Sequence, residues 1–283
     1  MSIPRIADYA LPTRAELPAN KVDWEFDPAR AALLIHDMQD YFVDFWAADS
    51  AQIRQVIDNL LALRQFCHQS GIPVFYTAQP AEQRDDERQL LNSLWGTGIT
   101  QHSDRAGIVA ALTPASQDKV LPKWRYSAFQ RATLQDDMKA LGRDQLIIGG
   151  VYAHIGCMIT ACDAFMRDIQ PFFVADALAD FSREEHDMAL RYVAGRCGSV
   201  VTTQQLAPVV ISMAQLRAQV VPFLDDGDDV EAHDNLIDFG LDSIRMMNLA
   251  AQWSRGGHAI DFTLMARDPT LAAWWALLSR HAT

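Results

Sequence analysis

The sequence has few of the features that mark membrane, secreted or metal-binding proteins. No apolar run approaches the ~20 residues that a membrane-spanning helix needs. The N-terminal segment has no basic region followed by an apolar one, so we expect no secretory signal and a cytoplasmic protein. The 283 residues include four cysteines, with no C-x-x-C and no H-E-x-x-H motif, which argues against a disulfide framework and a zinc site.

Positive charge is scarce as well. The formal net charge is −12, which argues against a nucleic-acid partner because such proteins need a basic face. Only four lysines occur, so Lys123 is not one of many interchangeable surface charges. Neither a P-loop nor a G-x-G-x-x-G motif is present, and a nucleotide cofactor is therefore not indicated.

The first two thirds of the chain alternate short apolar runs with amphipathic segments. This alternation predicts an α/β fold, a parallel sheet flanked by helices. Strands are expected at 31–37, 72–79, 144–152, 171–181 and 198–203, and helices at 51–71, from about 156, and at 182–195. Ligands bind at the carboxyl ends of such strands, so Asp37, Gln79 and the turn at 152–157 should converge on one pocket.

The pattern changes around residues 204–212, where the strand–helix alternation stops. From Met213 onward we count ten acidic residues against five arginines and no lysine. Helical patterns there predict a small acidic helical bundle. We therefore expect two domains, residues 1–208 and 209–283.

The stretch "DNLIDFGLDSIRMM" (234–247) is the most specific signal in the second domain. Its G-x-D-S element opening a helix resembles the phosphopantetheine attachment site of carrier proteins. Ser243 at a helix N-terminus suits a phosphate, and Asp242 could bring in the Mg²⁺ used in phosphoryl transfer. The alternative is that Ser243 merely caps the helix.

Apolar residues near this serine have two interpretations. Met247 lies one helical turn from Ser243, and Phe262 and Met265 belong to a neighbouring short helix. They form either a docking patch for partner enzymes or part of the core.

Nearly end to end, the chain resembles the bifunctional isochorismatase–aryl carrier proteins of catecholate siderophore assembly. The resemblance rests on "NKVDW", "RAALLIHDMQDYF", "YTAQP", "KWRYSAF", "GVYAHIGCM", "DAFMRDIQPFFVADALADFS" and "NLIDFGLDSIRMM". It implies hydrolysis of isochorismate in the first domain and covalent 4′-phosphopantetheine on Ser243 in the second. It also implies a homodimer, and as partners a phosphopantetheinyl transferase, an aryl-AMP ligase and the condensation domain of a nonribosomal peptide synthetase.

The first domain looks like the wider cysteine-hydrolase superfamily, which pairs an Asp, a Lys and a nucleophilic Cys. By resemblance the Asp is Asp37 and the Lys is Lys123. The nucleophile of the amide hydrolases lies six positions after the glycine that opens the motif, and counting from Gly150 reaches Gly156. Cys157 is one position further, about 100° away on a helix, and is interpreted as a packing residue.

The resemblance assigns roles to the remaining site residues. Asp37 is the candidate general acid, which requires a pKa raised by burial. Lys123 would bind a substrate carboxylate, orient Asp37 or stabilise it after proton transfer. His36 adjoins Asp37 in the sequence but is expected to point to the opposite face of the strand, so it is given no role. Gln79 and Arg88 would bind the substrate, and the apolar walls would be Phe42, Trp95, Tyr126 and Tyr152, unless these four are simply core residues.

Two other functions fit parts of the sequence. The chain could be an amide hydrolase that uses Cys157 with Asp37 and Lys123, although that leaves the carrier domain unexplained. It could also be a carrier and scaffold protein whose first domain is inactive.

Overall fold

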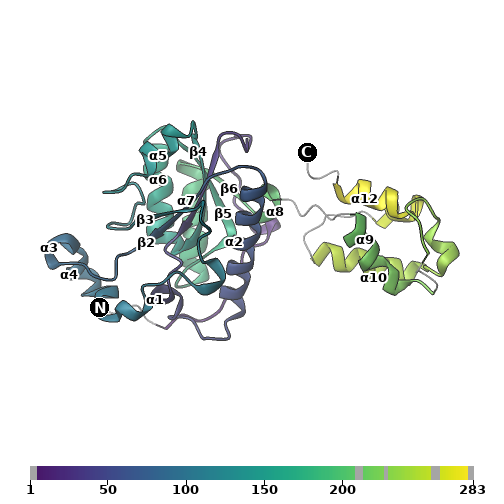
Figure 1. Ribbon diagram of the computed structural model, residues 1–283, viewed down its shortest axis with the longest axis horizontal. Coiled ribbons are helices and arrows are strands. Elements are labelled where there is room, and N and C mark those ends of the chain that lie inside the picture. The colour runs from purple at the N-terminus through teal and green to yellow at the C-terminus, as the bar shows by residue number, and fades with distance from the viewer. Residues whose placement is uncertain (1–4, 208–212, 226–228, 256–261, 280–283) are drawn as a thin grey trace. The chain divides into compact units, whose positions relative to one another are not determined.

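The computed structural model describes residues 5–207, 213–225, 229–255 and 262–279 (Figure 1). By its internal contacts the chain divides into two units, Met1–Ala207 and Pro208–Thr283. The predicted boundary between residues 208 and 209 lies outside the described residues.

The N-terminal unit is built on a six-stranded parallel sheet with the strand order β3-β2-β1-β4-β5-β6. The strands are β1 (Ala31–His36), β2 (Val74–Ala78), β3 (Lys119–Pro122), β4 (Gln145–Val151), β5 (Gln170–Ala179) and β6 (Ser199–Val201). The predicted α/β class is confirmed. Strand β3 was not predicted, because its four residues are mostly exposed and carry no apolar run.

The helices of this unit occupy the connections between strands. They are α1 (Asp40–Val43), α2 (Ala51–Gln69), α3 (Asp85–Arg88), α4 (Leu91–Trp95), α5 (Leu134–Ala140), α6 (Met158–Phe165), α7 (Arg183–Arg196) and α8 (Thr203–Leu206). Short 3₁₀ segments lie at Arg14–Glu16 (η1), Gly98–Arg105 (η2) and Ala110–Leu112 (η3). A π-helical turn, η4 (Ala153–Cys157), joins β4 to α6.

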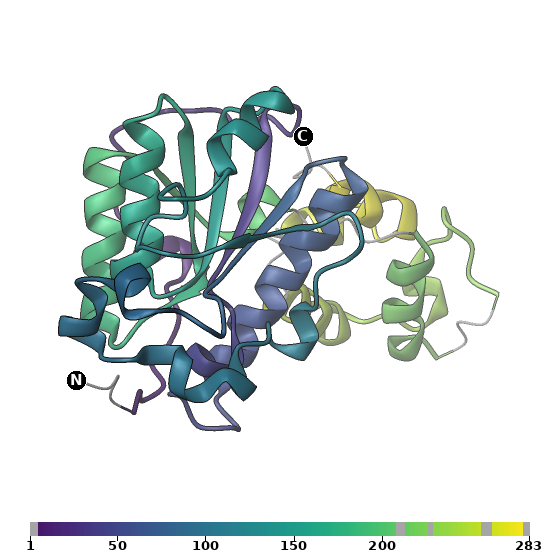
Figure 2. The same ribbon diagram turned by 60° about the vertical axis from the view of Figure 1, so that its left-hand side comes forward.

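Alternation of side chains along the strands gives the sheet two apolar faces. Leu33 and Ile35 of β1 belong to the core beneath α2, whereas Ala32 and Leu34 belong to the core shared with α5, α6 and α7. Figures 1 and 2 show α2 on one side of the sheet and these three helices on the other. Both faces are therefore covered, as a parallel sheet requires.

Local sequence explains where α2 begins and ends. The Ser50 hydroxyl caps the helix by accepting a hydrogen bond from the Ile53 amide at 3.1 Å. Val56 and Leu60, one turn apart, are fully buried against the sheet. Gly71, whose φ is +65°, follows the helix and allows the chain to reverse into β2.

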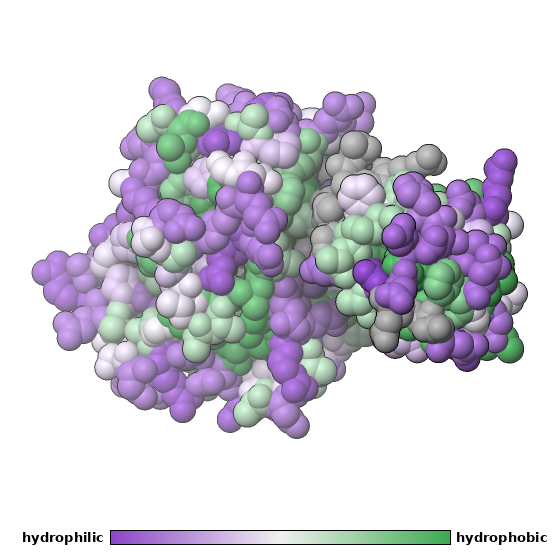
Figure 3. All heavy atoms as spheres, turned by 45° about the vertical axis from the view of Figure 1, so that its right-hand side comes forward, coloured by the Kyte–Doolittle hydropathy of each residue, from purple (hydrophilic) through white to green (hydrophobic). Residues whose placement is uncertain are grey.

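The C-terminal unit is helical, as the sequence predicts. Its helices are α9 (Met213–Val220), α10 (Ser243–Arg255), α11 (Phe262–Arg267) and α12 (Leu271–Ser279), with 3₁₀ segments at Val221–Phe223 (η5) and Leu236–Phe239 (η6). Trp253 and Trp274 meet in its core with ring centroids 5.7 Å apart, and the Trp274 indole donates to the Met265 carbonyl at 3.0 Å. Apolar patches also lie between hydrophilic residues on its surface (Figure 3).

None of the described helices is both long enough and apolar enough to cross a membrane.

Candidate active site and carrier site

One pocket is lined by polar or aromatic side chains that directly follow four neighbouring strands. Asp37 follows β1, Gln79 follows β2, Lys123 follows β3 and Tyr152 follows β4, and all four line the same pocket. The other predicted site residues of this unit (Phe42, Arg88, Trp95, Tyr126 and Gly156) line it as well. The structure thus brings together every residue that the sequence suggested for this site.

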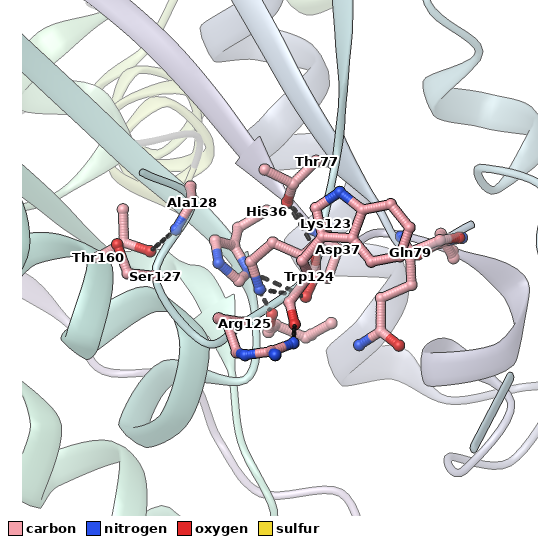
Figure 4. Close-up of polar contacts among 12 residues, drawn as sticks. His36, Asp37, Thr77, Gln79, Lys123, Trp124, Arg125, Ser127, Ala128 and Thr160 are labelled. Carbon is pink, nitrogen blue, oxygen red and sulfur yellow. Dashed lines mark hydrogen bonds and ion pairs between the residues drawn. The ribbon is translucent and has the colours of Figure 1, made fainter. Parts of the chain in front are cut away.

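Asp37 is held at the floor of the pocket by three hydrogen bonds (Figure 4). The Lys123 ammonium donates to its Oδ2 at 3.0 Å, and the Thr77 hydroxyl donates to its Oδ1 at 2.6 Å. The Asp37 amide in turn donates to the Thr77 oxygen at 3.0 Å. Asp37 has a φ of +49°, in the left-handed region that few residues other than glycine adopt, so its carboxylate is fixed by a strained backbone as well as by partners.

The expectation that burial raises the pKa of Asp37 is wrong. Burial acts in that direction, but the charge of Lys123 and the hydrogen bonds from Thr77 and Lys123 outweigh it, so the pKa lies below its ordinary value. Burial also lowers the pKa of His36 to about 4, so this ring is neutral at pH 7. Lys123 and Thr77 are therefore the partners that keep Asp37 ionised in the unliganded protein.

His36, which the sequence analysis left without a role, lies against the glycine at the nucleophile position. Its fully buried ring has Nδ1 2.9 Å from the Val151 carbonyl oxygen and 3.6 Å from Asp37 Oδ2. A Cβ atom at Gly156 would lie only 2.2 Å from His36 Cε1 and 2.9 Å from its Nε2. The imidazole thus occupies the space that a side chain at position 156 would need.

Cys157 points away from the pocket. Its side chain is fully buried in the core shared with α5, α6 and α7, and it does not line the pocket. Burial raises the pKa of its thiol well above the usual value, which disfavours the thiolate that a nucleophile needs. This placement favours the interpretation of Cys157 as a packing residue.

Two arginines bring positive charge to the pocket without a matching carboxylate. Arg88 is only 3% exposed. Its guanidinium donates hydrogen bonds of 2.8–3.0 Å to Asn92 Oδ1, Gln83 Oε1 and the Gly96 carbonyl. Arg125 donates to the backbone carbonyls of Glu87 and Trp124. Neither forms an ion pair with any carboxylate among the described residues, so both remain available to an anion.

Arg125 was missed by the sequence analysis, although it lies two residues after Lys123. Its signal was its place in the stretch "KWRYSAF", where the loop after β3 returns to the pocket. Tyr41 and Phe181 were missed as well, and both line the pocket. Phe181 packs against Tyr152 with ring centroids 4.6 Å apart.

The predicted aromatic residues form connected walls. The Trp95 indole donates to the Tyr126 hydroxyl at 2.8 Å, which joins α4 to the loop after β3. The Tyr152 hydroxyl donates to the Phe42 carbonyl at 2.8 Å, and the two rings meet edge to face. These contacts make the walls rigid and apolar.

In the C-terminal unit, Ser243 is the first residue of α10 and is exposed. The helix is capped by its neighbour, because Asp242 Oδ1 accepts a hydrogen bond from the Arg245 amide at 2.8 Å. The alternative in which Ser243 serves as the cap is therefore wrong. The Ser243 hydroxyl lies at the positive end of a 13-residue helix.

The apolar residues near Ser243 separate into core and surface. Met265 is fully buried, whereas Met247 is 57% and Phe262 is 36% exposed. Ile244, next to Ser243, is 71% exposed. The core alternative is thus wrong for Met247 and Phe262, and a role for them in docking remains a prediction.

Comparison with known families identifies the N-terminal unit. Residues 31–205 match the model of the isochorismatase domain. The chain belongs to the isochorismatase family. Residues 214–278 match the phosphopantetheine attachment site, so the predicted order of an isochorismatase domain followed by a carrier domain is confirmed.

Two relatives align with essentially the whole chain. It is 58% identical to enterobactin synthase component B of Escherichia coli K12 over 283 residues, 99% of each chain. It is 46% identical to an isochorismatase of Bacillus subtilis 168 over 302 aligned positions, covering 100% of this chain and 97% of the relative.

A solved structure supports the same fold for the isochorismatase unit. A cysteine hydrolase from Pseudomonas syringae pv. phaseolicola superimposes with a TM-score of 0.60 at 20% identity, covering 67% of this chain and 95% of the other. The likeness concerns the fold alone.

Proposed function

We propose that the N-terminal unit hydrolyses isochorismate to 2,3-dihydro-2,3-dihydroxybenzoate and pyruvate. The observation that carries this proposal is the pocket itself. It holds an Asp37–Lys123 pair beside two arginines that have no carboxylate partner among the described residues, and a glycine stands at the nucleophile position. Such a pocket suits an acid-catalysed reaction of a dianion, without a covalent enzyme intermediate.

Charge and shape both match isochorismate. The substrate carries two carboxylates, one on the ring and one on the pyruvyl group, and Arg88 and Arg125 supply two guanidiniums to bind them. Gln79 adds an amide from the end of β2. The aromatic walls then exclude bulk water from the reacting bond, which strengthens every charge interaction inside the pocket.

The reaction requires a proton on the terminal vinyl carbon, which produces an oxocarbenium ion. Water then adds to this ion, and the resulting hemiketal breaks down to pyruvate and the ring diol. Asp37 is the group we assign as acid. Since it is ionised in the unliganded protein, a substrate carboxylate placed nearby must raise its pKa so that it takes up a proton on binding.

Lys123 acts through Asp37. Its ammonium lies 3.0 Å from Asp37 Oδ2, close enough to orient the carboxyl group and to stabilise the carboxylate once the proton has left. The His36 ring fills the space that a nucleophilic side chain at position 156 would occupy, so only glycine fits there.

Direct measurement of pyruvate release from isochorismate tests this function. We expect Asp37→Asn to abolish release, because an amide cannot deliver the proton, while isochorismate binding survives. Asp136→Asn is the matched control, since Asp136 is exposed on α5 and outside the pocket. Normal turnover by Asp37→Asn contradicts the mechanism, and turnover of amides in place of isochorismate contradicts the proposed function.

We further propose that Ser243 carries 4′-phosphopantetheine, whose terminal thiol holds an aryl acid, 2,3-dihydroxybenzoate, as a thioester. The exposed hydroxyl at the N-terminus of α10 fits a phosphate ester because the helix dipole favours negative charge there. Asp242 offers a carboxylate beside it for the Mg²⁺ used during attachment.

The exposed residues around Ser243 support a docking surface on this unit. A phosphopantetheinyl transferase, an aryl-AMP ligase and a synthetase condensation domain must each reach the same serine. Met247, one turn further along α10, and Phe262, at the start of α11, offer exposed apolar side chains for such contacts. We also propose that the protein is a homodimer through its isochorismatase units, for which gel filtration with light scattering is the test.

A further inference from the structure

Two cysteines that are 35 residues apart in the sequence lie close together on the side of the sheet that α5, α6 and α7 cover. Cys162 lies on α6 and Cys197 follows α7, and their sulfur atoms are 3.8 Å apart. Both are free thiols, as are Cys67 and Cys157, which are fully buried at other places in the core. Neither Cys162 nor Cys197 lines the pocket of the proposed lyase.

The backbone around each thiol is well anchored. On α6, Thr160 Oγ1 accepts a hydrogen bond from the Ala128 amide at 3.0 Å. The amides of Cys197 and Gly198 both donate to the Val193 carbonyl, at 3.1 and 2.9 Å. A disulfide has its sulfurs about 2.05 Å apart, so the two sulfurs, now 3.8 Å apart, have to approach by somewhat less than 2 Å for the bond to form.

The two thiols differ in access and in acidity. Cys162 is partly exposed and lines an apolar surface groove together with Ile159 and Met166, whereas Cys197 is only 6% exposed. The hydrogen bond with Cys197 lowers the pKa of Cys162, and the same contact raises the pKa of Cys197. Because the thiolate is the reactive form, Cys162 is the thiol that an oxidant meets first.

We propose that Cys162 and Cys197 form a reversible dithiol–disulfide site whose oxidant is a small hydroperoxide. The Cys162 thiolate attacks one peroxide oxygen, so that an S–O bond forms and the O–O bond breaks. The sulfur of Cys197 then displaces the hydroxyl from Cys162, and the disulfide forms as the S–O bond breaks. Two thiols lose two electrons, hydrogen peroxide gains them, and two waters leave; a low-molecular-weight thiol reverses the step.

The bond closes a loop between residues 162 and 197 in a unit whose pocket lies elsewhere. Constraining this loop in the unfolded chain predicts a rise of the order of 10 °C in the thermal midpoint of the N-terminal unit. Pyruvate release should stay within about twofold, because neither cysteine lines the pocket of the proposed reaction. Oxidation of Cys162 then stops at the reversible disulfide and does not proceed to the irreversible sulfinic or sulfonic acid.

The test uses the full-length protein with hydrogen peroxide and, in parallel, with diamide, which forms disulfides directly. Remaining thiols are trapped with N-ethylmaleimide under denaturing conditions. The reduced protein, with its four cysteines, should take up four labels and the oxidised protein two. Peptide mapping should find residues 162 and 197 linked, and dithiothreitol should reverse both the label count and the rise in thermal midpoint.

Single substitutions separate the site from general oxidation. Cys162→Ser and Cys197→Ser should each abolish the linked peptide and the thermal shift, whereas Cys67→Ser, the matched control, should keep both. In Cys197→Ser, peroxide should drive Cys162 on to the sulfinic acid. A disulfide with any other pairing, or four labels remaining after either oxidant, overturns the proposal.

Discussion

Filling position 156 is the most direct test of how the site is built. A methyl group added in Gly156→Ala would place its carbon 2.2 Å from His36 Cε1, far inside any tolerated contact. His36 cannot yield easily, because its ring is fully buried and its Nδ1 bonds to the Val151 carbonyl. Overpacking of this kind costs about 1–3 kcal/mol in the free energy of unfolding, or roughly 3–10 °C in thermal midpoint.

The same substitution should damage catalysis. His36 adjoins Asp37 in the chain, and its Nδ1 lies 3.6 Å from Asp37 Oδ2, so a displaced ring also displaces the proposed acid. We expect pyruvate release to fall by roughly tenfold to a hundredfold, as a small misplacement of a reacting group does. A coupled assay with lactate dehydrogenase measures this, and thermal unfolding measures the stability.

A double-mutant cycle makes the prediction refutable. In a His36→Ala background the space at position 156 is open, so Gly156→Ala should cost little, which leaves a coupling of about 1–2 kcal/mol between the two sites. Gly195→Ala in α7 is the matched control, because a Cβ there meets nothing within 4 Å and should slightly stabilise the helix. Equal costs of Gly156→Ala in both backgrounds would refute the reasoning.

Three other predictions follow from the two sites. Cys157→Ser should keep lyase activity within a few-fold, since its buried thiol faces the core; a thousandfold loss in a folded variant contradicts this. Arg88→Ala and Arg125→Ala should each raise KM more than they lower kcat, through a lost carboxylate contact, and an unchanged KM in both argues against anion binding. Ser243→Ala should keep full lyase activity yet gain no mass with coenzyme A, Mg²⁺ and a phosphopantetheinyl transferase, whereas the parent gains about 340 Da; modification of the variant at another residue would disprove the assignment.

Much of the fold and the site could be predicted because both depend on short-range patterns. Buried parallel strands are continuous apolar runs, and the carboxyl ends of such strands lie at the same edge of the sheet. Asp37, Gln79 and Tyr152 could therefore be placed in one site from the sequence alone. Strand β3 escaped because it has four residues, of which only Leu121 is buried. Lys123 was therefore found by resemblance and not by its position at a strand end.

Interactions between side chains distant in sequence were the part that could not be predicted. The direction in which the pKa of Asp37 shifts depends on Lys123, which is 86 residues away in the sequence. Sequence patterns do not give the distance between two such side chains. His36 was judged by the alternation of strand faces, but it is the last residue of β1, where the chain turns into the pocket. Its contact with Gly156 depends on the pairing of β4 with β1, which are more than a hundred residues apart in the sequence.

The two guanidiniums that form no ion pair with a carboxylate among the described residues affect how the proposed reaction would end. Arg88 belongs to α3 and Arg125 to the loop after β3, so in the proposed complex a substrate with two carboxylates is bound by two segments at once, and each contact raises the effective concentration for the other. Cleavage divides that charge, because pyruvate and the ring diol each retain a single carboxylate. Each product would then keep only one carboxylate–guanidinium contact. We therefore expect the products to dissociate quickly and to inhibit weakly, although the intact substrate binds tightly.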